Sequence, residues 1–203
     1  MNTDNQQEIG LVARLSWLAG IMDGEGCIAL MVFPQRKRGG FRLQARATIG
    51  NTDEGIVERI ITTMQEIGVG FHVQQQVSKR YGCETGRMIK LIHVSTTTNL
   101  QRFLTIMLPR LASTEKVERG KILLRLIELR MERSRTEGKR NNTCYTQADV
   151  DLILEFLRLT KSKTVDRLAE FLNEHTREVR EARAHAKRSN RSRHDVLWSH
   201  ARV

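Results

Sequence analysis

The sequence predicts an α+β fold that begins with a buried helix and continues with pairs of strands separated by helices. Apolar residues recur at three- and four-residue steps between residues 9 and 22, which is typical of one buried helix face. Apolar and polar residues alternate between residues 42 and 49, which indicates a strand with one buried face. The predicted order is therefore helix, strand, strand, helix, strand, strand, helix, with more helices after it.

The first helix has two different faces. The core face is formed by Leu11, Leu15, Leu18 and Met22. Small residues elsewhere on the helix would let a second helix come into backbone contact. This predicted contact surface consists of Ala13, Ser16, Ala19 and Gly20.

Two acids, Asp23 and Glu25, lie where this helix should end, and Gly24 and Gly26 flank Glu25 as a turn signal. A helix C-terminus already carries partial negative charge, so a carboxylate there is disfavoured by roughly 0.3–1 kcal/mol. We therefore expect a positive group to compensate the acids. If two copies of the helix pair, their carboxylates converge and require a cation, and oxygen ligands suit Mg²⁺ better than zinc.

A first hairpin should follow, with strands at 27–33 and about 41–50 and a turn at Gly39 and Gly40. The first strand is apolar almost throughout, which hides its buried face. In the second strand, polar residues alternate with apolar ones, so one face is polar. A β-ribbon with such a face fits the DNA major groove. The alternative is a solvated strand face. The predicted DNA contacts here are Gln35, Lys37, Arg38, Arg42, Gln44, Arg46 and Thr48.

The second helix is predicted from residue 51 to 67, with Asn51 and Glu54 as reciprocal caps and Gly68 as its end. A second hairpin follows, with strands at 71–78 and 87–95 and a turn at 79–86. Gln75 interrupts the alternation, so the facing of the neighbouring glutamines stays open. The predicted contacts in this hairpin are Gln74, Gln76, Arg87 and Lys90. Arg87 and Lys90 could equally be phosphate anchors or ordinary surface charges.

Helices fill the remaining chain. Thr98 and Gln101 are predicted to cap a helix that ends at Pro109, and helices at 117–133, 147–159 and 165–185 follow. The predicted domains are a core at 1–140, a helical extension at 141–185 and a basic tail at 186–203.

Composition favours a polyanionic partner, because the 203 residues carry a formal net charge of +11. No apolar run is long enough to span a bilayer and no signal pattern opens the chain, so we expect an intracellular, soluble protein whose compartment stays open. The three cysteines are far apart, which disfavours a disulfide framework or a zinc ribbon.

The segment Leu18–Gly26 resembles the nonapeptide of the LAGLIDADG homing endonucleases, with conservative changes at its fourth, fifth and seventh places and Glu25 for aspartate at the eighth. The resemblance implies an αββαββα core with a saddle-shaped antiparallel sheet over about residues 8 to 130. Leu168–His175 lacks the motif glycines, so the chain has one motif. A single-motif member acts as a homodimer on a nearly palindromic DNA site.

The resemblance also implies a site and a reaction. Glu25 is the metal ligand, with Gly24 lending a carbonyl to Mg²⁺ or substitute Mn²⁺. Asn51 orients the attacking water, and Lys116 stabilises the developing charge, with Lys121 as the alternative lysine. The implied function is hydrolysis of double-stranded DNA with 3′ overhangs, in the service of intron or intein mobility. The role of Asp23 stays open between shaping the turn and tuning the local field.

Two other functions use the same fold and charge. A maturase would bind group I intron RNA without needing Glu25. A DNA-binding regulator would recognise its site without cutting it. Retention of Glu25 and of a candidate lysine favours cleavage over both.

Overall fold

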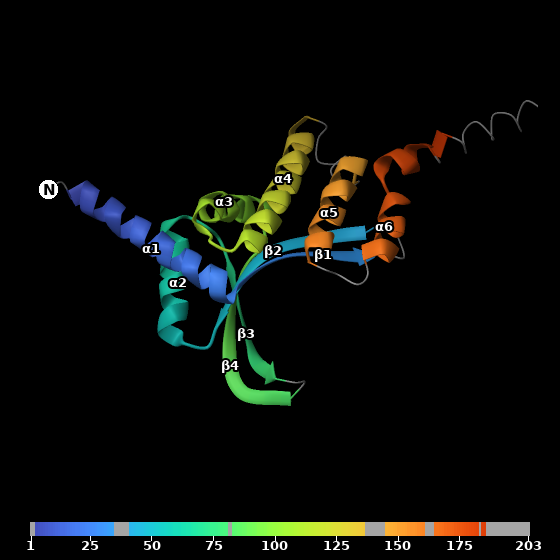
Figure 1. Cartoon of the computed structure of the whole chain (residues 1–203). Coiled ribbons are helices and arrows are strands. Elements are labelled where there is room, and N and C mark those ends of the chain that lie inside the picture. Colours follow the sequence, from blue (N-terminus) through green and yellow to red (C-terminus); the bar gives the residue numbers. More distant parts are fainter. Residues whose placement is uncertain are drawn as a thin grey trace, which may run out of the picture. The chain divides into compact units, whose positions relative to one another are not determined.

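The structure is a computed structural model that describes residues 3–34, 41–80, 83–136, 145–160, 165–182 and 184–185. Helices alternate with paired strands along the chain, as Figure 1 shows. The elements are α1 (Thr3–Glu25), β1 (Gly26–Pro34), β2 (Phe41–Asn51), α2 (Glu54–Glu66), β3 (His72–Arg80), β4 (Cys83–Val94), α3 (Thr97–Met107), the short 3₁₀ helix η1 (Leu108–Arg110), α4 (Thr114–Thr136), α5 (Gln147–Leu159) and α6 (Val165–Asn173). The predicted αββαββα order followed by C-terminal helices is confirmed.

The four strands form one antiparallel sheet in the order β1-β2-β4-β3. Residues directly opposite in neighbouring strands share a sheet face, and successive residues alternate between faces. Ile49 of β2 lies opposite Ile92 of β4, and both are buried in the core. Thr48 lies opposite His93 on the other face. We call the side with Ile49 the core face and the side with Thr48 the polar face.

The tertiary structure also resolves the facing of β1. Ile28 and Leu30 are buried, which places them on the core face. Cys27 is exposed, and Ala29 and Met31 are half-buried, on the alternate positions of the strand. The uniform apolarity of β1 therefore conceals a strand with one buried side.

Helix α1 is longer than predicted and leads directly into β1, without the expected turn (Figure 1). Leu15, Leu18 and Met22 are buried, as the helical spacing predicts. Gly26 is required by close packing, because a Cβ there would collide with Met22, including its backbone. α1 also packs on α2, where Arg59 stacks over the Trp17 ring at 4.3 Å.

Several predicted boundaries are wrong by a few residues. The N-cap of α2 is Asp53, whose carboxylate accepts from the Ile56 backbone N–H at 2.9 Å, so Asn51 and Glu54 do not cap it. Gly68 does follow the end of α2, with a φ of 63° that favours glycine. The N-cap of α3 is Thr96 rather than Thr98. Several short polar residues precede each of these two helices, so the sequence pattern alone selects the wrong N-cap residue.

The second hairpin is longer than predicted, because β3 and β4 extend through most of the expected turn at 79–86. Its strands lie side by side in Figure 1. A register shift between Val77 and Lys79 and a φ of 71° at Gly86 accommodate the turn-forming residues within the strands. Helix α5 has the predicted bounds. The helix predicted at 165–185 is interrupted, because α6 ends at Asn173, residues 174–176 form a turn, and residues 177–182 and 184–185 are helical again.

The chain divides into two compact units. The first comprises Met1–Val32 and Leu43–Glu128, and the second comprises Phe33–Arg42 and Leu129–Val203. Residues 140 to 144 lie outside the described residues, so the predicted domain boundary after residue 140 stays a prediction, as does the basic tail at 186–203.

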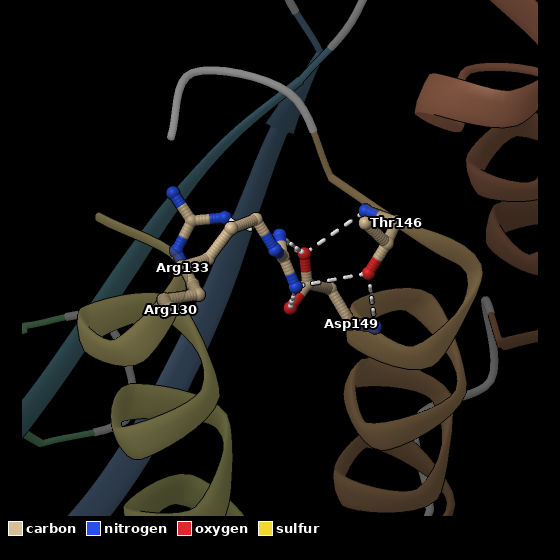
Figure 2. Close-up of polar contacts among 4 residues, drawn as sticks. All are labelled: Arg130, Arg133, Thr146 and Asp149. Atoms are coloured by element: carbon tan, nitrogen blue, oxygen red, sulfur yellow. Dashed lines mark hydrogen bonds and ion pairs between the residues drawn. The ribbon is translucent and has the colours of Figure 1, made fainter. Parts of the chain in front are cut away.

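The second unit contains an aromatic stack and a buried ionic cluster. The Phe41 ring stacks on the Tyr145 ring with centroids 4.2 Å apart. Asp149 is fully buried, and its carboxylate accepts two hydrogen bonds from Arg133, at 2.6 and 3.0 Å. Figure 2 shows the Arg133 guanidinium facing Asp149 and Thr146, which form the capping box of α5. Asp149 thus helps to cap the N-terminus of α5 and links α5 to the end of α4 through Arg133.

Candidate functional site

The C-terminal end of α1 is tied to the start of α4 through Asp23. Its two carboxylate oxygens accept hydrogen bonds from the backbone N–H groups of Ala112, at 2.7 Å, and Ser113, at 3.1 Å. These amides directly precede α4, where unpaired N–H groups and the helix dipole favour an anion. The structure therefore gives Asp23 a definite structural role, which the sequence leaves open.

Lys116 places a positive charge at the C-terminal end of α1. Its Nζ donates to the backbone carbonyls of Met22, at 2.8 Å, and Asp23, at 2.5 Å. A cation on the last carbonyls of a helix offsets the partial negative charge there. The expectation of a positive group at this helix end is therefore confirmed. Lys121, the alternative lysine, instead pairs with Glu118 on the surface of α4 at 2.9 Å.

Glu25 is the last residue of α1, and it is exposed. Within the described part of the chain, its carboxylate has no hydrogen-bond or ion-pair partner. Asp23 and Lys116 are thus engaged with the protein, whereas Glu25 is available to an external ligand. Among the described residues there is no group of three or more His, Cys, Asp or Glu that could hold a metal ion. One chain consequently offers a single free carboxylate at this position.

Asn51 lies at the end of β2, where its side-chain oxygen accepts from the Asp53 backbone N–H at 2.8 Å. This bond shapes the turn into α2. Asn51 lies opposite Lys90, and both fall on the core side of the sheet by alternation from Ile49. In the described part of the chain, no hydrogen bond joins Asn51 to Glu25 or Lys116.

Lys90 does not belong to the predicted DNA-contact row. It lies on the core side and forms an ion pair with Glu54 in the first turn of α2. The sequence prediction fails here because the irregular pattern of β3 and β4 does not reveal which residues share a face.

The polar face collects polar side chains from β2 and β3, on either side of His93 in β4. β2 contributes Gln44, Arg46 and Thr48, and β3 contributes Gln74 and Gln76. The register resolves the two glutamines, because His72, two residues before Gln74, lies opposite His93. Exposed Gln74 and Gln76 therefore share a face with Thr48.

Sequence reasoning missed His93, which lies at the centre of this face. Its Nδ1 lies 2.9 Å from Thr48 Oγ1, and its Nε2 lies 3.3 Å from Gln74 Oε1. Burial lowers the pKa of His93 from its ordinary value of 6.5, and the nearby Arg46 and His72 lower it further. The only available signal was a polar residue between two buried apolar ones, Ile92 and Val94.

This architecture also occurs in proteins of known structure. No protein-family model and no curated protein sequence matches the chain. Solved structures do match. The homing endonuclease I-CvuI in complex with its target is 19% identical, with a TM-score of 0.52 over 84% of this chain and 97% of that chain. The DNA-bound, group I intron-encoded homing endonuclease I-CeuI is 11% identical, with a TM-score of 0.57 over 79% and 76%.

A third match is the LAGLIDADG homing endonuclease I-GzeII in complex with its DNA target, 10% identical, with a TM-score of 0.51 over 80% of this chain and 50% of that chain. This chain has the LAGLIDADG homing-endonuclease fold. At 10–19% identity the likeness concerns the fold, and the motif segment Leu18–Gly26 forms the last part of α1 and the first residue of β1.

The LAGLIDADG helix α1 leaves a stripe of small residues uncovered. Ala13, Ser16 and Gly20 are exposed, and a Cβ at Gly20 would meet no atom within 4 Å. Ala19 does not belong to this stripe, because it is only 2% exposed and faces the core of its own chain. The predicted helix-contact surface is therefore reduced to three small residues.

Of the remaining predicted DNA contacts, the structure describes one side chain, that of Arg42. Arg42 belongs to the second unit, where its guanidinium lies 5.8 Å from the centre of the Phe33 ring. Gln35, Lys37 and Arg38 lie outside the described residues. Arg87 is in β4, but its side chain is outside the described part. No helix among the described residues is both long and apolar enough to cross a membrane.

Proposed function

We propose that this chain is a metal-dependent endonuclease that hydrolyses both strands of a specific DNA duplex as a homodimer. The observation that carries the proposal is the division of labour at the end of α1. Asp23 and Lys116 hold the helix end in place, and the Glu25 carboxylate is left exposed beside them. The fold and the net charge of +11 support DNA as the substrate.

The donor chemistry fits a hard divalent cation. Glu25 offers carboxylate oxygens and Gly24 a backbone carbonyl, and these are ligand types that Mg²⁺ prefers, with Mn²⁺ as a substitute. One chain provides too few ligands, whereas two copies of α1 provide two carboxylates. Bound metal would supply Lewis acidity and a more acidic water at the scissile phosphate.

The protein side chains would orient and stabilise the reacting groups. Lys116 is fixed by the Met22 and Asp23 carbonyls, and its charge stabilises the negative charge that develops on the phosphate. The Asn51 oxygen is bonded to Asp53, so its amide NH₂ is the group that would orient the attacking water.

A homodimer follows from the single motif and from the exposed small residues of α1. Pairing through Ala13, Ser16 and Gly20 would bring the two Glu25 residues together. This chain covers only half of the I-GzeII chain, as expected if I-GzeII contains two such units in one longer chain. Two-fold symmetry then predicts a long pseudo-palindromic site, cut to leave 3′ overhangs and used in intron mobility inside the cell.

Selection of cleaved sites from a randomised duplex library with Mg²⁺ tests activity, symmetry and specificity together. Glu25→Gln should abolish cleavage and retain binding, because it removes charge and keeps size. Glu58→Gln, at an exposed position of α2, is the matched control and should cleave normally. Cleavage by Glu25→Gln at the parental rate would contradict the proposal. Specific DNA binding without cleavage would indicate a regulator, and splicing of a group I intron by Glu25→Gln would indicate a maturase.

A further inference from the structure

His93 connects two side chains of the polar face that come from different strands. Thr48 of β2 lies on one side of the ring and Gln74 of β3 on the other, at 2.9 and 3.3 Å from the two ring nitrogens. His93 is only 7% exposed, whereas Gln74 is exposed and Thr48 half-buried. The histidine is thus a buried support beneath two more accessible polar groups.

The hydrogen-bond chemistry fixes one arrangement of protons. The Gln74 carbonyl oxygen only accepts, so His93 Nε2 must carry the hydrogen and donate. In a neutral imidazole the other nitrogen then accepts, so the Thr48 hydroxyl donates to His93 Nδ1. As a result, Gln74 presents its NH₂ group outward, and Thr48 presents oxygen lone pairs.

The surroundings keep His93 in this neutral form. The charged and titratable groups that act on it are Arg46, on the neighbouring strand β2, and His72, opposite it on β3. The two ring centroids of His72 and His93 are 6.5 Å apart. Arg46 Nε is itself buried and has no hydrogen-bond partner among the described residues, so positive charge next to His93 is not neutralised there. A second positive charge on the imidazole is therefore disfavoured.

We propose that His93 is a positioning residue that sets the hydrogen-bonding polarity of Gln74 and Thr48 and thereby the bases they accept. With its carbonyl oxygen held by His93 and its NH₂ group facing outward, Gln74 would read an acceptor such as guanine O6 or N7 or thymine O4. The bidentate pairing of a free glutamine with adenine would be disfavoured, because the oxygen is turned toward His93. Thr48, restricted to accepting, would read the amino group of cytosine or adenine. This inference rests on the DNA-binding part of the proposed function and does not require cleavage.

The test is base preference measured by selection of bound sites from a randomised duplex library, in a Glu25→Gln background that separates binding from cutting. Gln74→Glu keeps the acceptor for His93 and replaces the outward NH₂ by an oxygen. We expect one position in each half-site to change from guanine or thymine to cytosine or adenine. His93→Leu frees both side chains, and we expect about a tenfold loss of discrimination at the two positions they read.

Rescue by a conservative variant separates positioning from folding. The amide of His93→Gln can donate to Gln74 and accept from Thr48, so it should restore the parental preference. If His93→Leu weakened binding to every sequence equally and left the preferred bases unchanged, the role of His93 would be merely structural and the proposal would be overturned. If the parent selected no DNA sequence at all, the proposed function would fail first.

Discussion

Asp23 and Lys116 connect α1 and α4 in both directions. The Asp23 carboxylate caps the backbone N–H groups before α4, and the Lys116 ammonium caps the last carbonyls of α1, including that of Asp23. Each side chain places its charge where the dipole of the other helix favours it. The residue pair thus fixes the helix end that presents Glu25.

Asp23→Ala should lower the free energy of unfolding by about 1 kcal/mol, as expected when a helix N-terminus loses its capping carboxylate. Urea denaturation followed by circular dichroism measures this change. Glu58→Ala, at an exposed position within α2, is the control, and its free energy of unfolding should be close to that of the parent. Equal stability of the parent and Asp23→Ala would mean that the two hydrogen bonds do not contribute.

Lys116→Met should lower both stability and DNA cleavage, because it removes a cation from the end of α1 and from the proposed active centre. Hydrogen bonds to charged groups contribute about 1.5–3 kcal/mol, and the half-buried position of Lys116 puts the expected loss near the lower figure. Lys121→Met is the matched control, since its exposed pair with Glu118 contributes little. Should Lys121→Met be the variant that loses cleavage, Lys121 would replace Lys116 in the proposed mechanism.

Asp149→Ala should destabilise the second unit by about 3–5 kcal/mol, because it removes the buried carboxylate that pairs with Arg133 and half of the α5 capping box. Thermal unfolding of the full chain measures this loss. Asp151→Ala changes an exposed acid of the same helix and serves as the control. Similar melting of both variants would show that the cluster in Figure 2 is energetically unimportant.

Gly20→Leu should prevent self-association without unfolding the chain. The side chain meets no atom of its own protomer at the Cβ, and leucine favours helix more than glycine does. In a dimer the same side chain would occupy the space of the partner helix. Analytical ultracentrifugation measures the oligomeric state. Gln65→Leu, at an exposed position of α2, is the control, because it also adds an exposed leucine. A dimer formed by Gly20→Leu would place the interface elsewhere.

His93 should make stability depend on pH below its ordinary pKa of 6.5. Burial, followed by Arg46 and His72, lowers the pKa of folded His93, so the unfolded chain takes up this proton first as the pH falls. The free energy of unfolding should therefore decrease below pH 6.5 and level off below the folded pKa. His93→Gln should lose less stability than the parent between pH 7.5 and 5.5. Parallel curves for the two proteins would contradict this assignment.

The order of the elements and the motif can be read from the amino-acid sequence. The helical spacing of Leu15, Leu18 and Met22, and the alternation along β2, follow from local geometry that repeats every few residues. The resemblance of Leu18–Gly26 to the LAGLIDADG motif leads to the fold that the structural matches show.

The contacts between distant residues, in contrast, are visible only in the folded chain. Asp23 and Lys116 are separated by 93 positions, and His93 contacts Thr48 and Gln74 through a register that the irregular β3 pattern does not encode. The tertiary structure also shows that Ala19 is buried and that Lys90 lies on the core face. Local periodicity specifies a helix or a strand, but the pairing of helix ends and strand faces depends on how the whole chain packs.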